Sequence, residues 1–271
     1  MTEPSTAWAV ARPHPALRHL VARYIGYAQR DVTLGVHRGL PSRHVTLIIS
    51  LERPVRITGE TPMQALVGGM HLGPVLIAQD PVQCGLHVEL NPLGVRTLLG
   101  VSAAELSGQV VELGDLGLAS LAGRLAEVPD WAGRFALLDE VFGAVAADGP
   151  GSAPEVGWAW RRMLGVDGRV RVESLAEEIG WSRRHFGELF RRELGLSPKQ
   201  VARVLRFERA LRLVRGRVDL ARVAADCGYY DQAHLSNEWR ALAGCSPRTW
   251  IAEELPFLQD SRVFSAADSG A

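Results

Sequence analysis

Cysteine is scarce in this sequence, and long apolar runs are missing. The three cysteines, Cys84, Cys227 and Cys245, form no CxxC pair and leave an odd count, so we expect reduced thiols rather than a disulfide framework. No segment approaches the ~18 to 20 consecutive apolar residues of a membrane-spanning helix, and the N-terminus shows no signal-peptide pattern. These absences predict a cytoplasmic protein with no membrane partner.

Short catalytic motifs are missing as well. The sequence contains no GxSxG, HExxH, GxGxxG or Walker motif, each of which places a nucleophile, a metal or a phosphate by fixed residue types at fixed spacing. Only Cys84 lies in the N-terminal half, whereas a repair protein that transfers alkyl groups to a zinc-bound thiolate would need several cysteines there. We therefore expect no enzymatic activity and no cofactor.

The net charge of zero hides an uneven distribution. Residues 1–158 contain 11 Arg and Lys against 15 Asp and Glu, whereas residues 159–255 contain 18 against 13. A positive C-terminal half is what a nucleic-acid partner would meet. A solvated helix face would give the same modest excess, so the charge supports this interpretation without establishing it.

The most informative stretch, from about Val170 to Trp250, contains one helical pattern twice. Residues 175–180 (LAEEIG) match residues 223–228 (VAADCG). The offset is 48 residues before the glycine and 49 after it, so the second copy has one extra residue in its turn. Beyond the turn the matched pairs are Phe186 with Leu235, Phe190 with Trp239, Gly195 with Gly244, and Ser197-Pro198 with Ser246-Pro247. A repeat of this length predicts two similar supersecondary units.

Each copy has the signals of a helix-turn-helix. A short helix ends at Gly180 or Gly228, the residue type that tolerates a left-handed C-cap. A polar N-cap, Ser182 or Asp231, then starts a second helix with one apolar face. A joining helix is expected from about Ser197 to Arg215, and Gln200 completes a capping box at its start. This helix would span about 28 Å, close to the ~34 Å between successive major-groove faces of B-DNA.

These residues resemble the DNA-binding domain of bacterial AraC/XylS-family transcriptional regulators. The specific matches are the glycine-aromatic turn and second helix in residues 228–235, and the Gly-x-Ser-Pro segment with its aromatic in residues 244–250. The resemblance implies operator DNA and RNA polymerase as partners, activation as the commoner mode, and an N-terminal effector-binding or dimerising domain that is often a cupin-like barrel. Asn237-Glu238-Trp239 depart from the usual basic residue and Phe, which leaves the base preference open.

The same resemblance assigns the DNA-contacting faces. The base-reading candidates include Arg184 for guanine, Glu188 for a cytosine amino group, Gln232 and Asn237 for adenine, and Ala233 for a thymine methyl. Arg191, Arg240 and Arg248 are expected to meet phosphate. The full expected set is Ser182, Arg183, Arg184, Gly187, Glu188, Arg191, Gln232, Ala233, His234, Asn237, Arg240 and Arg248. Ordinary solvation of these side chains is the alternative.

The N-terminal half predicts an α+β arrangement. Helical spacing of apolar residues favours a helix over 16–28, and β-like runs at 45–50, 55–58, 75–78 and 85–90, separated by Pro and Gly, predict a compact antiparallel sheet or barrel. Ser102 and Glu105 suggest a capping box at a helix start. The stripe from Trp131 to Val145 predicts a helix that either covers the sheet or forms a homodimer interface.

The best linker is residues 148–154 (DGPGSAP). We therefore expect an effector-binding or dimerisation domain over 1–150, a DNA-binding domain over 155–258, and a disordered tail over 259–271. Within the first domain, His71, His87 and Glu89 are the candidate ligand-binding residues, and their spacing does not favour a metal. Two other functions remain open: a helix-turn-helix scaffold that binds protein, and a DNA-binding module fused to an unrecognised enzyme.

Overall fold

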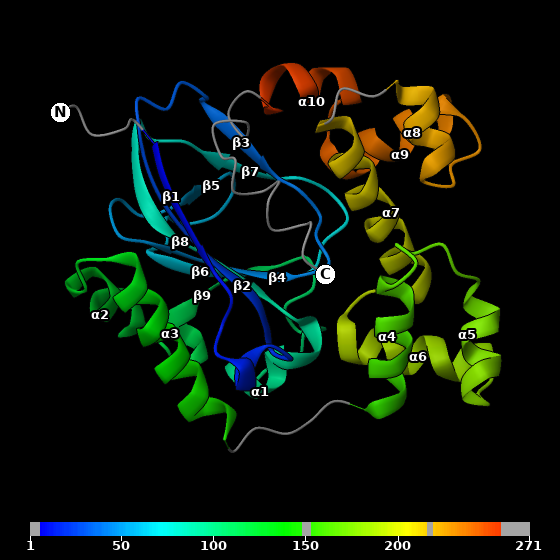
Figure 1. The fold of residues 1–271 in the computed structure, drawn as a ribbon, viewed down its shortest axis with the longest axis horizontal. Coiled ribbons are helices and arrows are strands. Elements are labelled where there is room, and N and C mark those ends of the chain that lie inside the picture. Colours follow the sequence, from blue (N-terminus) through cyan, green and yellow to red (C-terminus); the bar gives the residue numbers. More distant parts are fainter. Residues whose placement is uncertain (1–5, 148–152, 216–218, 256–271) are drawn as a thin grey trace.

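The computed structural model describes residues 6–147, 153–215 and 219–255, and it consists of a β-rich part followed by a helical part (Figure 1). The predicted fold class, an antiparallel β-rich N-terminal region followed by an all-α C-terminal region, is confirmed. The linker predicted at 148–154 falls mostly outside the described residues, as does the predicted tail over 259–271.

The larger sheet forms the frame of the β-rich part. All its neighbouring strands pair antiparallel, as expected for a sheet built from short strands and tight turns. In spatial order its six strands are β1 (Thr6–Ala11), β2 (Val21–Arg30), β8 (Val82–Leu90), β4 (Val45–Ser50), β6 (Ala65–Gly68) and β9 (Val110–Glu112).

A smaller sheet lies across one face of the larger one. It contains β3 (Val36–Gly39), β7 (Val75–Ala78) and β5 (Arg56–Ile57), again antiparallel. Ile57, Met63 and Leu66 form an apolar cluster between the two sheets, and Ile48 and Ile77 pack against it. The predicted strands at 45–50 and 75–78 match β4 and β7, whereas the run at 85–90 begins earlier and the run at 55–58 is shorter.

Strand register sorts the larger sheet into two faces with different chemistry. Residues directly opposite one another on neighbouring strands share a face. One row of partners is Tyr24, Val88, Leu47 and Val67, which are all fully buried. The row beside it, on the opposite face, is Ile25, His87, Ile48 and Leu66. The first face packs on helices, and the second faces the smaller sheet.

Helix α3 (Trp131–Ala146) covers the helix-facing side of the sheet. Its Phe135 ring stacks on Tyr24 with a centroid distance of 5.8 Å, and Phe142 lies 6.4 Å from the same ring. The Tyr24 hydroxyl donates a hydrogen bond of 2.9 Å to Asp139 Oδ1. The stripe predicted from Trp131 to Val145 therefore forms a helix that packs on the sheet.

The helix predicted over 16–28 is wrong. The chain there forms a 3-10 turn, η1 (Pro15–Leu17), and then strand β2. The apolar residues that suggested a helix are all buried, but as part of a turn and a strand: Leu17, Leu20, Val21, Tyr24 and Ile25. β2 lies between β1 and β8 and is covered on both faces, so its apolar residues do not alternate and their spacing imitates a helix.

The capping box predicted at Ser102 forms without a helix. Ser102 N donates to Glu105 Oε2 at 2.7 Å, and Glu105 N donates to Ser102 Oγ at 3.3 Å. The following residues form turns, and Gly108 N closes the segment by donating to Met70 O at 2.9 Å. The reciprocal hydrogen bonds are local, and the left-handed φ of 71° at Gly108 ends the turn before a helix continues.

Two 3-10 helices and three α-helices complete the β-rich part: η2 (Pro92–Gly94), η3 (Leu113–Leu116), α1 (Val95–Leu99), α2 (Leu121–Glu127) and α3. The helical part contains α4 (Pro154–Leu164), α5 (Val172–Ile179), α6 (Arg183–Leu194), α7 (Pro198–Arg215), α8 (Leu220–Asp226), α9 (Gln232–Ala243) and α10 (Pro247–Glu253). None of the helices in the described ranges combines the length and apolarity that crossing a membrane requires.

Two cores divide the helical part unevenly. The large core that fills the β-rich part continues without interruption into α4, α5, α6 and the first half of α7. A second core begins at Phe207, in the second half of α7, and holds α8, α9 and α10. Helix α7 is therefore the element that belongs to both.

The turn at 102–108 allows a direct test of this packing. A Cβ added at Gly69 would overlap the carbonyl oxygen of Leu106. We expect Gly69→Ala to lower the free energy of unfolding by about 3 kcal/mol or more, because backbone rather than a flexible side chain must move. Chemical denaturation followed by circular dichroism measures it.

Gly143→Ala is the matched control. A Cβ on Gly143 would meet nothing within 4 Å, and the residue lies inside α3. Replacing a helix-interior glycine by alanine should raise stability by about 0.5 to 1 kcal/mol. Equal stability of the two variants would contradict the close approach at Gly69.

Candidate nucleic-acid interface and internal cavity

The two predicted helix-turn-helix units are present, one at each end of α7. Helices α5 and α6 lie near its N-terminal end, and α8 and α9 lie near its C-terminal end (Figure 1). Gly180 and Gly228 end the first helix of each unit with φ of 77° and 74°. Both glycines adopt the left-handed conformation that the sequence predicted.

The second helix of each unit begins at the predicted N-cap. Ser182 Oγ accepts a hydrogen bond from His185 N at 3.2 Å. Asp231 Oδ1 accepts one from His234 N at 2.7 Å. Each cap satisfies one of the amide groups that a helix start leaves without an intrahelical partner. The remaining amides and the positive end of the helix dipole are available to an anion such as a phosphate.

Aromatic packing fixes the direction of these second helices. In α6, Phe186 and Phe190 are fully buried and meet edge to face with centroids 5.4 Å apart. In α9, Trp239 is fully buried against Phe207 of α7 at 5.1 Å and Trp250 of α10 at 5.7 Å. Because one face of each helix is anchored in this way, the opposite face is presented outward.

The exposed face of α6 carries the predicted charged residues. The side chain of Arg184 is 88% exposed and that of Glu188 is 64% exposed. They form an ion pair of 2.9 Å along the helix, and Arg183 pairs with Glu173 of α5 at 3.0 Å. A Cβ on Gly187 would meet nothing within 4 Å. Arg191 is exposed one turn further along.

The exposed face of α9 is polar but less charged. Gln232, Ala233 and Asn237 are exposed, and Arg240 donates to Asn237 Oδ1 at 2.9 Å. His234 is also exposed, yet its Nδ1 accepts a hydrogen bond of 3.3 Å from Tyr230 N. His234 therefore supports the turn. Arg248 is exposed on α10, apart from this face.

Two features of the second unit were not predicted. Tyr230 is 93% exposed and occupies the position of the extra residue in the second turn. Glu238 is held by Arg203 of α7 through two hydrogen bonds of 2.7 and 3.2 Å. The sequence offered a signal for Tyr230, the change in repeat offset, but none for Arg203, since nothing local links residues 35 positions apart.

A second set of ion pairs braces α7 against the turn after α4. Asp167 Oδ2 accepts from Arg209 at 2.6 Å, and Asp167 Oδ1 accepts from Arg212 at 2.6 Å. Burial alone would raise the pKa of the Asp167 carboxyl, but the hydrogen bonds from the two guanidinium groups outweigh burial and lower it. Because the Asp167 carboxylate binds both Arg209 and Arg212, it fixes how the first unit lies along α7.

The far end of each second helix docks onto the β-rich part. Gly195, which ends α6, lies so close to Ser107 that an added Cβ would be 2.5 Å from its Cβ. Gly244, which ends α9, lies equally close to Pro74, at 2.8 Å from its Cγ. The C-terminal end of the second helix of each unit therefore contacts the N-terminal half of the chain. The N-terminal ends of these two helices are directed away from that contact.

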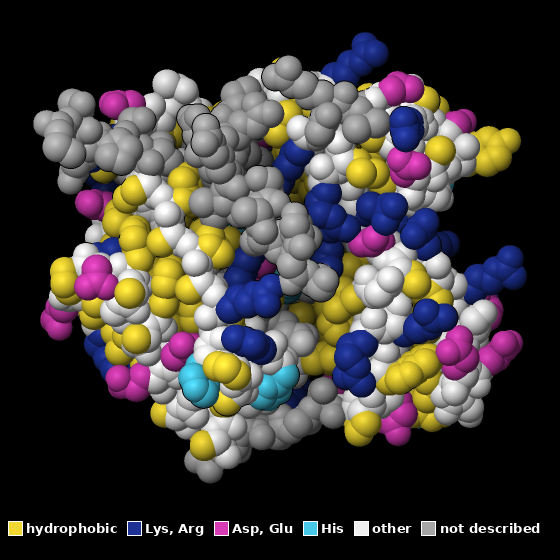
Figure 2. All heavy atoms as spheres, viewed as in Figure 1, with side chains coloured by type: hydrophobic (Ala, Val, Ile, Leu, Met, Phe, Trp, Pro, Cys, Tyr) yellow, Lys and Arg dark blue, Asp and Glu magenta, His cyan; other side chains and the backbone are white. Residues whose placement is uncertain are grey.

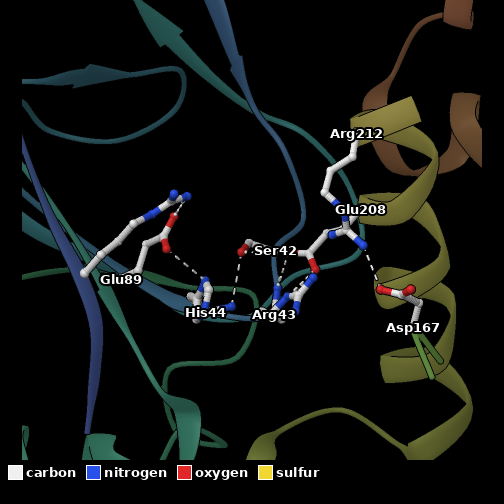
Figure 3. Close-up of polar contacts among 8 residues, drawn as sticks. Ser42, Arg43, His44, Glu89, Asp167, Glu208 and Arg212 are labelled. Carbon is white, nitrogen blue, oxygen red and sulfur yellow. Dashed lines mark hydrogen bonds and ion pairs between the residues drawn. The ribbon is translucent and has the colours of Figure 1, made fainter. Parts of the chain in front are cut away.

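Polar contacts across the same junction form a continuous chain (Figure 3). Glu208 of α7 accepts from Ser42 Oγ at 3.1 Å, from Arg43 N at 2.8 Å and from Arg43 Nε at 2.6 Å. His44 N donates to Ser42 Oγ at 3.1 Å, and His44 Nδ1 lies 3.4 Å from Glu89 Oε2. The chain therefore runs from the centre of the larger sheet to the helix shared by both units.

A buried carboxylate makes a parallel connection nearer the C-terminus. Glu254 is fully buried and contacts His37 Nδ1 at 2.7 Å, while Arg38 N donates to it at 2.9 Å. Burial alone would raise the pKa of the Glu254 carboxyl, but its hydrogen bond with His37 lowers it. Strand β3 is tied to the end of the helical part in this way.

A partly open cavity of about 300 Å³ lies between the two sheets, comparable with pockets that bind small organic molecules. The three residues predicted to bind a ligand, His71, His87 and Glu89, all line it. His71 Nδ1 is bonded to the carbonyl oxygen of Gly73. The sequence did not indicate Ser42, which lines the cavity and also bonds to Glu208.

Burial and neighbouring charges give His87 and Glu89 different protonation states. Burial lowers the pKa of His87 to about 4, against the opposing effect of Glu89. Burial alone would raise the pKa of Glu89, but His44 and Arg23 lower it to about 2. Arg23 donates to Glu89 Oε1 at 2.7 Å. At neutral pH the cavity therefore contains an uncharged imidazole beside a paired carboxylate.

Side chains of one kind gather on different parts of the surface. Figure 2 shows basic side chains spread over the helical part and along its boundary with the β-rich part, whereas apolar side chains dominate the visible face of the β-rich part. The uneven charge seen in the sequence is thus also uneven in space.

Comparisons with known proteins agree on the helical region. Residues 175–253 match a family model described as a helix-turn-helix domain. No curated protein is similar enough to match the chain. Among solved structures, the C-terminal domain of AraT, a response regulator from Geobacillus stearothermophilus, is 23% identical with a TM-score of 0.35, covering 37% of this chain and 85% of that one.

Two other solved structures are similar over more of the chain. ToxT from Vibrio cholerae O395 is 9% identical with a TM-score of 0.47, covering 92% of this chain and 98% of ToxT. The AraC-like transcriptional activator CuxR is 15% identical with a TM-score of 0.25, covering 77% of this chain and 86% of that one. The matched range in the family model coincides with the repeat found between residues 170 and 250.

The Asp167 ion pairs predict a pH-dependent stability. Because the pKa of this carboxyl is lowered in the folded protein, its contribution is fully present above the ordinary aspartate pKa of about 3.9 and is lost as the pH falls through the lower folded value. We expect Asp167→Asn to destabilise the protein by about 1 to 3 kcal/mol at pH 7.

The difference between wild type and Asp167→Asn should shrink as the pH falls below about 4. Thermal unfolding at several pH values measures it, with Asp115→Asn as the control because no hydrogen bond to the Asp115 side chain is found among the described residues. A constant difference between pH 7 and pH 3 would show that Asp167 contributes by something other than its charge.

Proposed function

We propose that this chain, whose residues 175–253 form an AraC-type helix-turn-helix domain, is a sequence-specific DNA-binding transcriptional regulator. In this proposal α6 and α9 enter successive major grooves of one duplex. The N-terminal half, over about 1–150, binds an effector and modulates the DNA-binding region over about 155–258.

One observation carries the proposal. Both second helices present their N-terminal ends outward, while their C-terminal ends, at Gly195 and Gly244, dock against the β-rich part. The N-terminal residues of a recognition helix are the ones that reach base edges. Helix α7, with 18 residues, separates the two units by about 27 Å along its axis, near the spacing of successive major grooves.

The first unit is suited to direct readout of G·C pairs. Arg184 is long, exposed and able to donate two hydrogen bonds to guanine O6 and N7. Its partner Glu188 is able to accept from the amino group of cytosine. The ion pair between them keeps both side chains on one line of the helix, and opening it costs little because the pair is solvent-exposed. Gly187 lets the helix backbone approach closely.

The second unit is suited to A·T pairs and to the backbone. Gln232 and Asn237 match adenine edges, and Ala233 matches a thymine methyl. In this proposal the exposed residues Arg191, Arg240 and Arg248 neutralise phosphates. Ser182 and Arg183 contribute at the start of α6, where the helix dipole favours phosphate. His234 contributes indirectly, through the turn that it supports.

The remaining parts of the proposal concern regulation. The cavity lined by His71, His87 and Glu89 is the effector site. Its occupancy reaches the DNA-binding units through Ser42 and Glu208, since these residues connect the cavity wall to α7. By resemblance to AraC/XylS regulators, the chain acts in the cytoplasm as an activator that contacts RNA polymerase, and it works as a homodimer or as a single chain.

Duplex binding is the first test. Fluorescence anisotropy with a duplex enriched from a random pool should show tight binding that scrambled DNA does not match. If Arg191, Arg240 and Arg248 each neutralise a phosphate, the plot of log affinity against log salt between about 50 and 200 mM should have a slope of about −3 or steeper. Enrichment of no sequence, or binding insensitive to salt, would favour a protein-binding scaffold.

Arg184 gives a residue-level test. Arg184→Ala should weaken binding to the enriched site by about 1 to 3 kcal/mol and leave binding to random DNA nearly unchanged. Arg124→Ala is the matched control, because Arg124 is an exposed arginine in an ion pair on α2, within the β-rich part. Equal losses on both duplexes would mean that Arg184 contacts phosphate only.

A further inference from the structure

The cavity between the two sheets has a polar group on an otherwise apolar row. His87 lies on the central strand β8, directly opposite Ile25 on one side and Ile48 on the other. Leu66, on the next strand, continues the row. Ile57 and Ile77 of the smaller sheet line the cavity from the opposite wall. Along this row the imidazole lies between aliphatic side chains that offer it no hydrogen bond.

The Nε2 atom of His87 has no hydrogen-bond partner among the described residues. This atom is also buried. Buried polar atoms in folded proteins are nearly always hydrogen-bonded, so an exception at a cavity wall indicates a group that binds there. An imidazole nitrogen is able to pair with either a donor or an acceptor, because the neutral ring has two tautomers.

The charged groups that act most on His87 are already paired within the protein. Glu89 is bound by Arg23 on one oxygen and approached by His44 on the other. Asp80 is paired with Arg56 at 2.9 Å. Burial holds His87 in its uncharged form, as its lowered pKa shows. A charged ligand group beside His87 would have to displace one of these partners or lie there without a counter-ion, and both arrangements are unfavourable.

The aromatic residues at the cavity extend its apolar surface. Trp8 and Tyr27 both line it, with ring centroids 6.0 Å apart and planes inclined by 43°. Burial raises the pKa of the Tyr27 hydroxyl, so this group stays protonated and adds no charge. Flat or aliphatic ring systems are the molecules that such walls contact most completely.

We infer that the effector is a small, uncharged, largely apolar molecule that carries one hydrogen-bonding group, and that this group pairs with Nε2 of His87. The inference rests on the proposed function, because it names the ligand class of the effector site. It also separates His87 from Glu89: His87 contacts the ligand, whereas Glu89 is a positioning residue that connects the cavity to Ser42 and α7 through His44.

Three probes with one ring system test the ligand class: 2-naphthol, 2-methylnaphthalene and 2-naphthoate. They differ in a single substituent, which is a hydroxyl, a methyl or a carboxylate. For the full-length wild-type protein, we expect titration calorimetry to give about tenfold tighter binding of 2-naphthol than of 2-methylnaphthalene. We expect 2-naphthoate to bind more weakly than both.

Variants at His87 test the assigned contact. His87→Leu should reduce 2-naphthol affinity to that of 2-methylnaphthalene, whose own affinity stays within about twofold of wild type because the apolar walls are intact. His87→Gln keeps a hydrogen-bonding group and should retain most of the preference for naphthol. Ile48→Trp fills the cavity beside His87 and should abolish binding of both probes.

Several results would overturn the inference. Naphthoate binding at least as tightly as naphthol would assign a charged ligand. An unchanged naphthol preference in His87→Leu would place the contact elsewhere, and failure of all three probes to bind would exclude this ligand class. Duplex binding by the wild-type protein is measured separately, so failure of the ligand class with intact DNA binding contradicts only this inference. Loss of all DNA binding would instead contradict the proposed function.

Discussion

Helix α7 must be buried along its whole length, and the arrangement of the molecule follows from that requirement. Its first half contributes Val201 and Leu205 to the core that also fills the β-rich part, whereas Phe207 and Leu211 belong to the second core. Four of its charged residues form ion pairs with Asp167, with Glu238 and with Arg43. A helix fixed by apolar contacts on several sides and by ion pairs on the others has little freedom to turn. The two units at its ends therefore hold a defined relative orientation.

The β-rich part takes a direct part in that orientation. It docks against the glycine corner that ends each second helix, at Ser107 and at Pro74. It also reaches α7 through Glu208 and the end of α10 through Glu254. Because the walls of the cavity include Ser42 and His37, residues that contact a ligand are one side chain away from those that hold the helices. A ligand that moves Ser42 or His37 would therefore act on α7 or on the end of α10 through a single contact.

Local signals in the sequence predicted the helical part well, and long-range pairings explain where prediction failed. Caps such as Ser182 and the left-handed Gly180 depend on residues within a few positions, so both were readable. Strand β2 was misread because the helix α3 that covers one of its faces lies more than 100 positions away, so no local pattern reveals that both faces are buried. For the cavity, the sequence indicated His71, His87 and Glu89 as candidate ligand-binding residues, and all three line it. It did not reveal Arg23 or Glu208, since cross-strand register and junction contacts are absent from local patterns.

The two units are related by sequence but are not interchangeable. The second turn carries Tyr230, an almost fully exposed ring with no counterpart in the first unit, and its second helix has fewer charges. A DNA-binding chain with two different recognition units is asymmetric along the DNA. In the proposed complex it would occupy a site that is not a palindrome, and it would do so in one direction only. A single bound chain would therefore have one fixed orientation on the DNA, and the β-rich part would always lie at the same position relative to the bound sequence.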